Sequence, residues 1–218
     1  MVRACHAAGC AATVRVRANE PSLVSGVLDA GAQGVWVPHV ESAEEARRVV
    51  EAARFPPEGR RGAAPMTRAA RWSAEPWEAH VERSKAETTI FLVVETVKGM
   101  EAVEEIAAVP GVDAVIFGQF DYGVDAGLSP SDFYGGGTLS GIHPVLEEAA
   151  GKVLRACQAA GIAAGTVAFS REVGLQWVAK GFRVLVWSTD VTLFSRAVTG
   201  LRADIAACEE AAAMPRTP

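Results

Sequence analysis

Two carboxylates follow neighbouring apolar segments, where they could share a metal ion. Glu95 ends the apolar run 90–95, and Asp121 comes shortly after the run 114–118. A charge that ends an apolar strand is costly unless it is paired or bound to a metal. Two carboxylates together with several waters suit a hard divalent cation such as Mg²⁺ or Mn²⁺. A simpler interpretation stays open, in which Glu95 pairs with an arginine and Asp121 caps a turn or a helix.

An arginine-rich segment is the second feature whose residues could take part in binding or catalysis. Residues 54–62 read Arg-Phe-Pro-Pro-Glu-Gly-Arg-Arg-Gly, and Arg68 and Arg71 follow, the latter just before Trp72. Proline and glycine here predict a fixed loop that presents arginines, and a guanidinium is a natural partner for a carboxylate or a developing enolate oxygen. A solvated basic loop is the alternative, which the rigid Pro-Pro segment disfavours.

Six short apolar runs, alternating with helical segments, must position these residues. The runs are mostly continuous, as is typical of a parallel sheet that is covered on both faces. The predicted strands are 13–17, 34–38, 90–95, 114–118, 163–169 and 182–187. The predicted helices are 21–30, 42–53, 76–86, 99–108, 144–160, 171–180 and 191–213.

This order of elements predicts either a doubly wound sheet or a closed βα barrel. No Gly-x-Gly-x-x-Gly follows a strand, which disfavours dinucleotide binding. Barrel sites are built from loops at the carboxyl ends of strands. The segment 119–143 is such a loop, with a flexible insertion at 135–137, whereas 54–75 qualifies only if a short strand lies near 52–55. Ser42 and Glu45 predict a capping box in which each side chain accepts from the other's backbone amide.

Composition narrows the functional classes. The chain has 218 residues and a formal net charge of −5, which argues against a nucleic-acid-binding surface. No apolar run is long enough to span a bilayer, no signal peptide is visible, and four cysteines in this length do not make a disulfide scaffold. We therefore expect one domain over 1–218, located in the cytoplasm, with no nucleic-acid or membrane partner.

Taken in order, several segments resemble the HpcH/HpaI family of metal-dependent pyruvate aldolases. The most specific is the arginine-aromatic-Pro-Pro block that ends in Arg61-Gly62, followed by Arg-Ala-Ala-Arg-Trp at 68–72. The other matching segments are 28–38, 42–47, 94–96, 111–121 and 188–194. The resemblance covers nearly the whole chain.

The resemblance implies an α/β fold, a TIM-type (β/α)8 barrel that is usually hexameric, which cleaves or forms aldol adducts of pyruvate or a related 2-oxo acid. Glu95 and Asp121 match the family's two metal-binding carboxylates, for Mg²⁺ or Mn²⁺. Arg61 matches the arginine that contacts the keto or enolate oxygen. Backbone amides around Phe120 and Asp121, if they open a helical turn, would suit the substrate carboxylate. We therefore expect an aldehyde-lyase whose partners are a small 2-oxo acid and an aldehyde.

Three departures from the family pattern stand out. Val93 replaces a glutamine two residues before the metal-binding glutamate, and residues 118–123 read Gly-Gln-Phe-Asp-Tyr-Gly where the family usually reads Gly-Pro-Ala-Asp-Leu-Ser. The family's catalytic base, a histidine in an Asp-x-Glu-His segment, has no counterpart in the chain. His39, at the end of a predicted strand, is the leading substitute base; the simpler interpretation is a pocket-lining or hydrogen-bonded histidine.

The remaining histidines and tryptophans have simpler interpretations. We expect His6 and His80 to be exposed or packed on helices, and His143 to mark the start of a helix. Core or subunit-interface positions are the most economical interpretation of four tryptophans, which are Trp72, Trp77, Trp177 and Trp187.

The number of predicted strands limits the fold. A (β/α)8 barrel needs eight strands and typically ~250 residues, and about six strands are recognisable here. We therefore expect a barrel that is incomplete at its N-terminus, or whose gap another subunit covers. Two alternatives to an aldolase remain: a citrate-synthase-like or CoA-thioester lyase on the same fold, and a truncated, non-catalytic barrel that binds an oxo acid.

Overall fold

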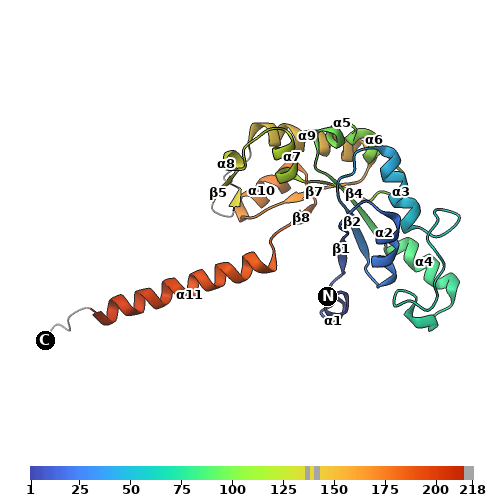
Figure 1. Cartoon of the computed structure of the whole chain (residues 1–218), viewed down its shortest axis with the longest axis horizontal. Coiled ribbons are helices and arrows are strands. Elements are labelled where there is room, and N and C mark those ends of the chain that lie inside the picture. The colour runs from blue at the N-terminus through green and yellow to red at the C-terminus, as the bar shows by residue number, and fades with distance from the viewer. Residues whose placement is uncertain (136–137, 140–142, 214–218) are drawn as a thin grey trace.

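A curled, all-parallel sheet organises the chain. The computed structural model describes residues 1–135, 138–139 and 143–213, and its main sheet has the order β1-β2-β3-β4-β7-β8. The sheet curls into a half-barrel with helices on its convex side (Figure 1). The strands are β1 (Thr13–Arg15), β2 (Gly34–Val37), β3 (Thr89–Val94), β4 (Ala114–Phe117), β7 (Ala163–Val167) and β8 (Val184–Val186). The predicted α/β fold, a TIM-type barrel that is incomplete with about six strands, is thereby confirmed.

The helices follow the predicted order closely. In the first half of the chain they are α1 (Val2–Ala7), α2 (Pro21–Asp29), α3 (Ala43–Ala53), α4 (Trp77–Glu87), α5 (Val97–Glu101) and α6 (Val103–Ala107). In the second half they are α7 (Gln119–Asp125), α8 (Pro130–Phe133), α9 (Pro144–Ala160), α10 (Arg171–Lys180) and α11 (Asp190–Ala213). A short hairpin of β5 (Tyr134–Gly135) and β6 (Thr138–Leu139) stands apart from the main sheet.

Alternate residues of β3 serve opposite faces of the sheet. Ile90, Leu92 and Val94 belong to the core under the helices, whereas Phe91 and Val93 belong to a smaller apolar cluster on the other face. In that second cluster the Phe91 ring stacks on Trp36 with centroids 4.5 Å apart. The concave face of the half-barrel is therefore floored by apolar side chains, and Val93 forms part of that floor.

One expectation about loops is wrong, and the condition attached to another is not met. No strand lies near 52–55, because α3 continues to Ala53; the segment 54–75 therefore begins at the amino-terminal edge of the sheet. The segment 119–143 is not a simple loop, because α7 and α8 form there around the buried Phe133. The predicted insertion at 135–137 lies mostly outside the described residues.

Local capping agrees with the sequence in part. Ser42 accepts a hydrogen bond from the Glu45 amide at 3.2 Å, as predicted. The reciprocal bond differs, since the Glu45 carboxylate accepts from the amide of Glu41 at 2.8 Å rather than from Ser42. His143 is the N-cap of α9, where its Nδ1 accepts from the Val145 amide. His80 is packed, and of the four tryptophans only Trp177 is fully buried.

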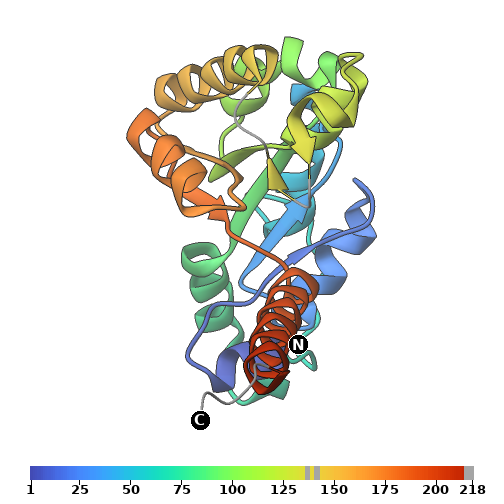
Figure 2. The ribbon, with the colours of Figure 1, turned by 90° about the vertical axis from the view of Figure 1, so that its left-hand side faces the viewer.

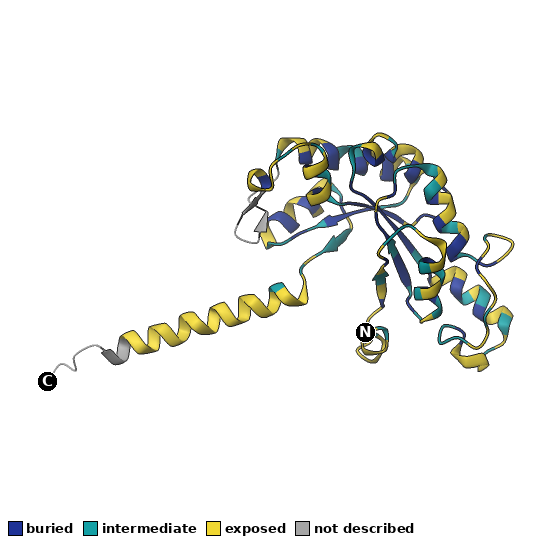
Figure 3. Ribbon diagram, in the orientation of Figure 1, coloured by how far each residue is buried: buried dark blue, intermediate teal, exposed yellow. Residues whose placement is uncertain are grey.

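Helix α11 projects away from the half-barrel (Figures 1 and 2). Its described side chains are almost all exposed (Figure 3). Large apolar residues are among them, with Phe194 73% and Leu201 59% exposed. Within the described part of the chain, no helix combines the length and apolar character that a bilayer crossing requires.

The packing of α9 predicts a difference between two cysteines. Cys157 is buried, and burial raises the pKa of its thiol to about 11, whereas Cys10 is exposed. Since the thiolate is the reactive form, iodoacetamide at pH 8 should alkylate Cys157 at least about a hundredfold more slowly than Cys10. Peptide mass spectrometry measures both rates. Equal rates in the folded protein would contradict this packing, and urea-unfolded protein is the control.

Candidate active site at the carboxyl edge of the sheet

Polar side chains from neighbouring strands converge on Glu95. The Glu95 Oε1 atom accepts a hydrogen bond from the backbone amide of His39 at 3.0 Å. The same oxygen lies 3.5 Å from an Nη atom of Arg15 and 3.6 Å from Nε2 of His39. Arg15 ends β1, His39 follows β2, and Glu95 follows β3. The carboxyl ends of three adjacent strands therefore build one polar site.

Glu95 is a buried carboxylate, with a side chain only 3% exposed. Burial is the main cause that raises the pKa of Glu95, and the nearby negative charge of Asp121 acts in the same direction. The amide and the ring of His39, and the charge of Arg15, oppose that shift in the Glu95 pKa. The ionised carboxylate is thus only partly compensated by the protein.

Gly118 makes room for this carboxylate. A Cβ atom at Gly118 would lie 2.5 Å from the Glu95 Cβ and 2.8 Å from its Oε2. The Gly118 amide donates to the Val94 carbonyl at 3.0 Å, which ties the end of β4 to the end of β3. Gln119 then opens α7, and its side-chain amide donates to the Val167 carbonyl at 2.8 Å. These contacts fix the first turn of α7, which carries Asp121, beside Glu95.

Asp121 and Phe120 are both exposed in that first turn. Phe120 is 41% exposed, and its ring meets Phe133 edge-on at 5.6 Å. The expected helical turn at Phe120 and Asp121 is present, because the Tyr122 amide donates to the Gly118 carbonyl. Both side chains are thus open to solvent, and Asp121 is near enough to Glu95 for its charge to raise the pKa of that carboxyl group.

His39 adopts an unusual backbone conformation. Its φ is +51°, in the left-handed region that non-glycine residues seldom occupy. Such strain costs of order 1–3 kcal/mol and concentrates at functional sites. The conformation directs the amide of His39 to Glu95 while the ring stays 60% exposed. The ring is therefore accessible to a bound small molecule.

Arg61 does not reach this site. Its guanidinium is buried, lies 2.7 Å from the Asp29 carboxylate at the end of α2, and donates to the Ser84 hydroxyl at 3.3 Å. It also stacks over the Phe55 ring at 4.6 Å. Asp29 precedes β2, and Ser84 belongs to α4, which precedes β3; Arg61 thus lies at the amino-terminal edge of the sheet, opposite to Glu95. The expected position of Arg61 at the substrate has to be corrected.

Arg15 is the arginine that the sequence reasoning missed. It is the last residue of β1, on the same edge as Glu95, and its side chain is 54% exposed. The run 13–17 carries two arginines, Arg15 and Arg17, and the rule that pointed to Glu95 does not choose between them, because only the structure shows that β1 ends at Arg15. The simpler interpretation of Glu95 is thus partly realised, since an arginine does lie beside it, but that arginine remains largely in solvent.

The donor set fits a hard cation that binds few protein ligands. Within the described ranges, no three side chains of His, Cys, Asp or Glu gather as a metal cage. The buried Glu95, whose charge is under-compensated and which faces the like charge of Asp121, is the arrangement that a divalent cation would stabilise. Mg²⁺ in particular binds through one or two carboxylates and keeps waters or substrate oxygens.

Known proteins share this architecture. The model of the HpcH/HpaI aldolase/citrate lyase family matches residues 1–197. The chain is 34% identical over 189 residues to a hydroxypyruvate/pyruvate aldolase from Chromohalobacter salexigens, which is 86% of this chain and 70% of that protein.

Solved structures agree with this match. A HpcH/HpaI aldolase/citrate lyase family protein from Burkholderia cenocepacia J2315 superimposes with a TM-score of 0.81 at 34% identity, over 94% of this chain and 77% of that one. The CitE protein from Mycobacterium tuberculosis, in complex with magnesium and acetate, shares the fold with a TM-score of 0.55 at 19% identity, over 81% of this chain and 63% of that one.

The close approach at Gly118 gives a direct test of the site's packing. The substitution Gly118→Ala should lower the free energy of unfolding by about 1–3 kcal/mol, because its Cβ would displace the Glu95 side chain. Gly26→Ala is the matched control, since Gly26 lies in α2 with no atom near its missing Cβ and should gain roughly 0.5–1 kcal/mol. Urea denaturation measures both, and equal stabilities would show that Glu95 is not confined.

Proposed function

Because the chain belongs to the HpcH/HpaI aldolase/citrate lyase family, we propose that it is a carbon–carbon lyase. It would cleave or form aldol adducts of pyruvate or a related 2-oxo acid. The observation that carries this proposal is the buried carboxylate of Glu95 at the carboxyl edge, surrounded by Asp121, Arg15 and His39. The hydroxypyruvate/pyruvate aldolase of C. salexigens, 34% identical, supports the substrate class.

Glu95 and Asp121 are the residues that would hold the divalent cation, with Mg²⁺ or Mn²⁺ as the proposed ion. When bound, such a cation supplies Lewis-acid polarisation of a keto oxygen. The rigid placement of Glu95 by the His39 amide and by Gly118 serves that role, because its carboxylate needs no reorganisation on binding.

Arg15 takes the role that the sequence assigned to Arg61. The Arg15 guanidinium lies beside Glu95, where it could reach a small oxo acid bound there. Its side chain is exposed enough to turn toward such a ligand. There it would donate hydrogen bonds to the oxygen on which negative charge develops as the enolate forms. Phe120 and Asp121, exposed at the start of α7, are the proposed contacts on the other side of the substrate.

His39 is the candidate group for proton transfer at the substrate carbon. Its exposed ring lies at the site, and an imidazole can exchange a proton near neutral pH. The left-handed backbone at His39 keeps that ring beside Glu95 whether it acts as a base or only lines the site. Replacement of His39 by glutamine separates the two roles. Glutamine can still form hydrogen bonds in the site, but it cannot accept a proton from the substrate carbon.

A homo-oligomer is the proposed assembly, with a hexamer implied by the family resemblance. Exposed apolar residues recur along α11 at alternating spacings of three and four, which is the pattern of a helix seam. They are Val191, Phe194, Val198, Leu201 and Ile205. This surface is defined as the α11 seam. We place a second copy of the chain on it, and the expected location of the assembly is the cytoplasm.

Proton exchange into pyruvate tests the function. With Mg²⁺, the protein should exchange the methyl protons of pyruvate with solvent deuterium, as measured by NMR. Arg15→Ala should slow this exchange by about 10²–10³-fold, the usual cost of losing one charge-stabilising donor. Arg61→Ala, compared at equal folded fraction by circular dichroism, should retain it. The reverse order of the two variants would overturn the assignment of Arg15.

Metal dependence has its own readout. Mg²⁺ should raise the melting temperature of the wild-type protein and should not do so for Glu95→Gln, because linkage stabilisation requires a site in the folded state. Exchange that persists in EDTA, or in Glu95→Gln, would contradict the metal assignment. Condensation of oxaloacetate with acetyl-CoA, without retro-aldol activity, would point to the citrate-synthase-like alternative. Pyruvate binding without exchange would point to the non-catalytic one.

The α11 seam predicts the behaviour of a charged variant. Phe194→Glu combined with Leu201→Glu should leave a monomer at micromolar concentration, because both charges would be buried against the second copy. Ala203→Glu is the control, since Ala203 lies on α11 outside the seam. Light scattering after size-exclusion chromatography measures the mass. An unchanged oligomer in the double variant would exclude this surface as the interface.

A further inference from the structure

A cavity lies at the amino-terminal edge of the sheet, away from Glu95. It has a volume of about 600 Å³, within the usual range for small-molecule sites. Its walls come from the segments before β1, β2 and β3 and from the loop that follows α3. The cavity shares none of its lining with the groups placed at the candidate active site. We call this cavity the amino-edge pocket.

The lining of the amino-edge pocket is strongly cationic. Four arginines face one acidic residue, and these are Arg61, Arg68, Arg71, Arg83 and Glu87. His80 lines the wall as well, and burial lowers its pKa, with Arg83 acting in the same direction, so that the ring adds no positive charge at neutral pH. The pocket therefore has the electrostatics of an anion site.

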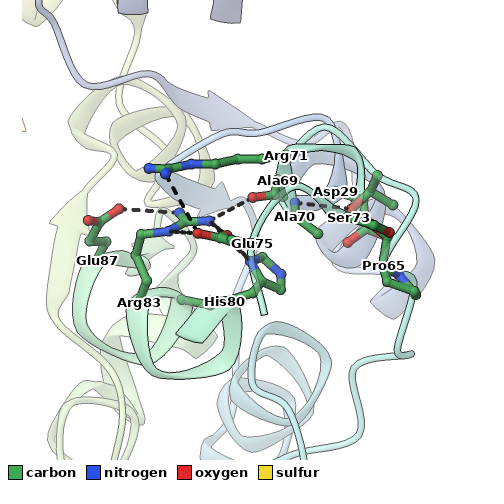
Figure 4. A network of polar contacts seen from close by, with 12 residues as sticks. Asp29, Pro65, Ala69, Ala70, Arg71, Ser73, Glu75, His80, Arg83 and Glu87 are labelled. Atoms are coloured by element: carbon green, nitrogen blue, oxygen red, sulfur yellow. Dashed lines mark hydrogen bonds and ion pairs between the residues drawn. The ribbon is translucent and has the colours of Figure 1, made fainter. Parts of the chain in front are cut away.

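Carboxylates compensate three of these arginines. Arg61 pairs with Asp29 at 2.7 Å. Arg83 is paired with Glu75 and lies 3.6 Å from Glu87, as Figure 4 shows.

The third pair is weaker. Arg71 reaches the same Glu75 at 3.7 Å, so one carboxylate serves two guanidinium groups. Asp29, Glu75 and Glu87 together balance the charges of Arg61, Arg71 and Arg83, so the excess positive charge around the pocket comes from Arg68.

Arg68 has no counter-charge. Its Nε is enclosed without a hydrogen-bond partner, and the terminal nitrogens, which are not enclosed, have no hydrogen bond or ion pair to any residue in the described ranges. The side chain lies against Gly31, whose φ is +95° and where a Cβ would come within 3.3 Å of the Arg68 Cδ and Nε. Unsatisfied enclosed donors are rare, and each calls for an explanation.

A strained turn forms the rim of the amino-edge pocket. Arg71, Trp72 and Ser73 have consecutive φ values of +52°, +57° and +63°, although none is glycine. The turn is fastened by Arg83, which donates to the Ala69 carbonyl at 2.8 Å, and by the Ser73 hydroxyl, which donates to the Pro65 carbonyl at 3.1 Å (Figure 4). The result is a 63% exposed indole of Trp72 in the pocket lining.

We propose that the amino-edge pocket binds a small, multiply charged organic oxyanion, with Arg68 as its principal partner. A phosphate or a carboxylate group would accept the donors that Arg68 leaves unused, in the bidentate geometry that a guanidinium favours. The indole of Trp72 packs against the remainder of the ligand. The site is separate from the proposed aldolase site and does not depend on it.

Titration of the full-length protein tests this proposal. The probes are inorganic pyrophosphate for the phosphate source and citrate for the carboxylate source, each at constant ionic strength, with tryptophan fluorescence and calorimetry as readouts. Arg68→Gln should weaken binding of the preferred probe by about 10- to 100-fold. This variant removes no hydrogen bond between described residues, so its melting temperature without probe should be unchanged.

Three further variants make the test decisive. Arg47→Gln changes the net charge equally at an exposed position of α3 and should leave the affinity unchanged. Trp72→Phe should remove the fluorescence change while calorimetry still detects binding. Glu95→Gln should bind as the wild type does. Equal losses in Arg47→Gln and Arg68→Gln, a loss in Glu95→Gln, or no binding of either probe at millimolar concentration would each overturn the proposal.

Discussion

The buried carboxylate of Glu95 is the constraint on which the site depends. An ionised carboxylate that is almost completely buried is costly. To offset this cost the protein supplies one backbone amide, from His39, and one partly solvated guanidinium, from Arg15. Accommodating it requires a glycine at 118 and a left-handed backbone at His39. Several local irregularities thus have one cause, which is the need to hold a charge at the end of an apolar strand.

The two edges of the parallel sheet carry different arginines, and the difference follows from connectivity. Residues that end strands, such as Arg15, reach the carboxyl edge, whereas residues that follow helices, such as Arg61, return to the amino-terminal edge. The loop after α3 is built around buried ion pairs and a strained turn at Arg71–Ser73, and it shapes a cationic cavity instead of the edge at Glu95. The loop that the prolines predicted to be fixed therefore presents its arginines at the other end of the molecule.

An open half-barrel leaves surfaces that a closed barrel would cover. In the described part of the chain, β1 and β8 each pair on one side only, and unpaired strand edges are normally covered or paired. On the concave face Trp36 is only half-buried, and α11 extends into solvent with an apolar seam. Packing with other copies of the chain is the physical solution that these surfaces favour, since apolar area is stabilised when it leaves water.

The sequence by itself determined the alternation of strands and helices and the number of strands in the main sheet, because both follow from local periodicity and apolar runs. For the same reason it showed that Glu95 and Asp121 follow the ends of neighbouring strands. It did not determine which arginine meets Glu95, since proximity across the sheet depends on the register of β1 against β2 and on the edge at which each loop emerges. The sequence also did not predict the helices α7 and α8, because their stability comes from burying Phe133 and not from a long amphipathic pattern. Tertiary structure alone assigned Arg15 to the site and Arg61 to the opposite edge.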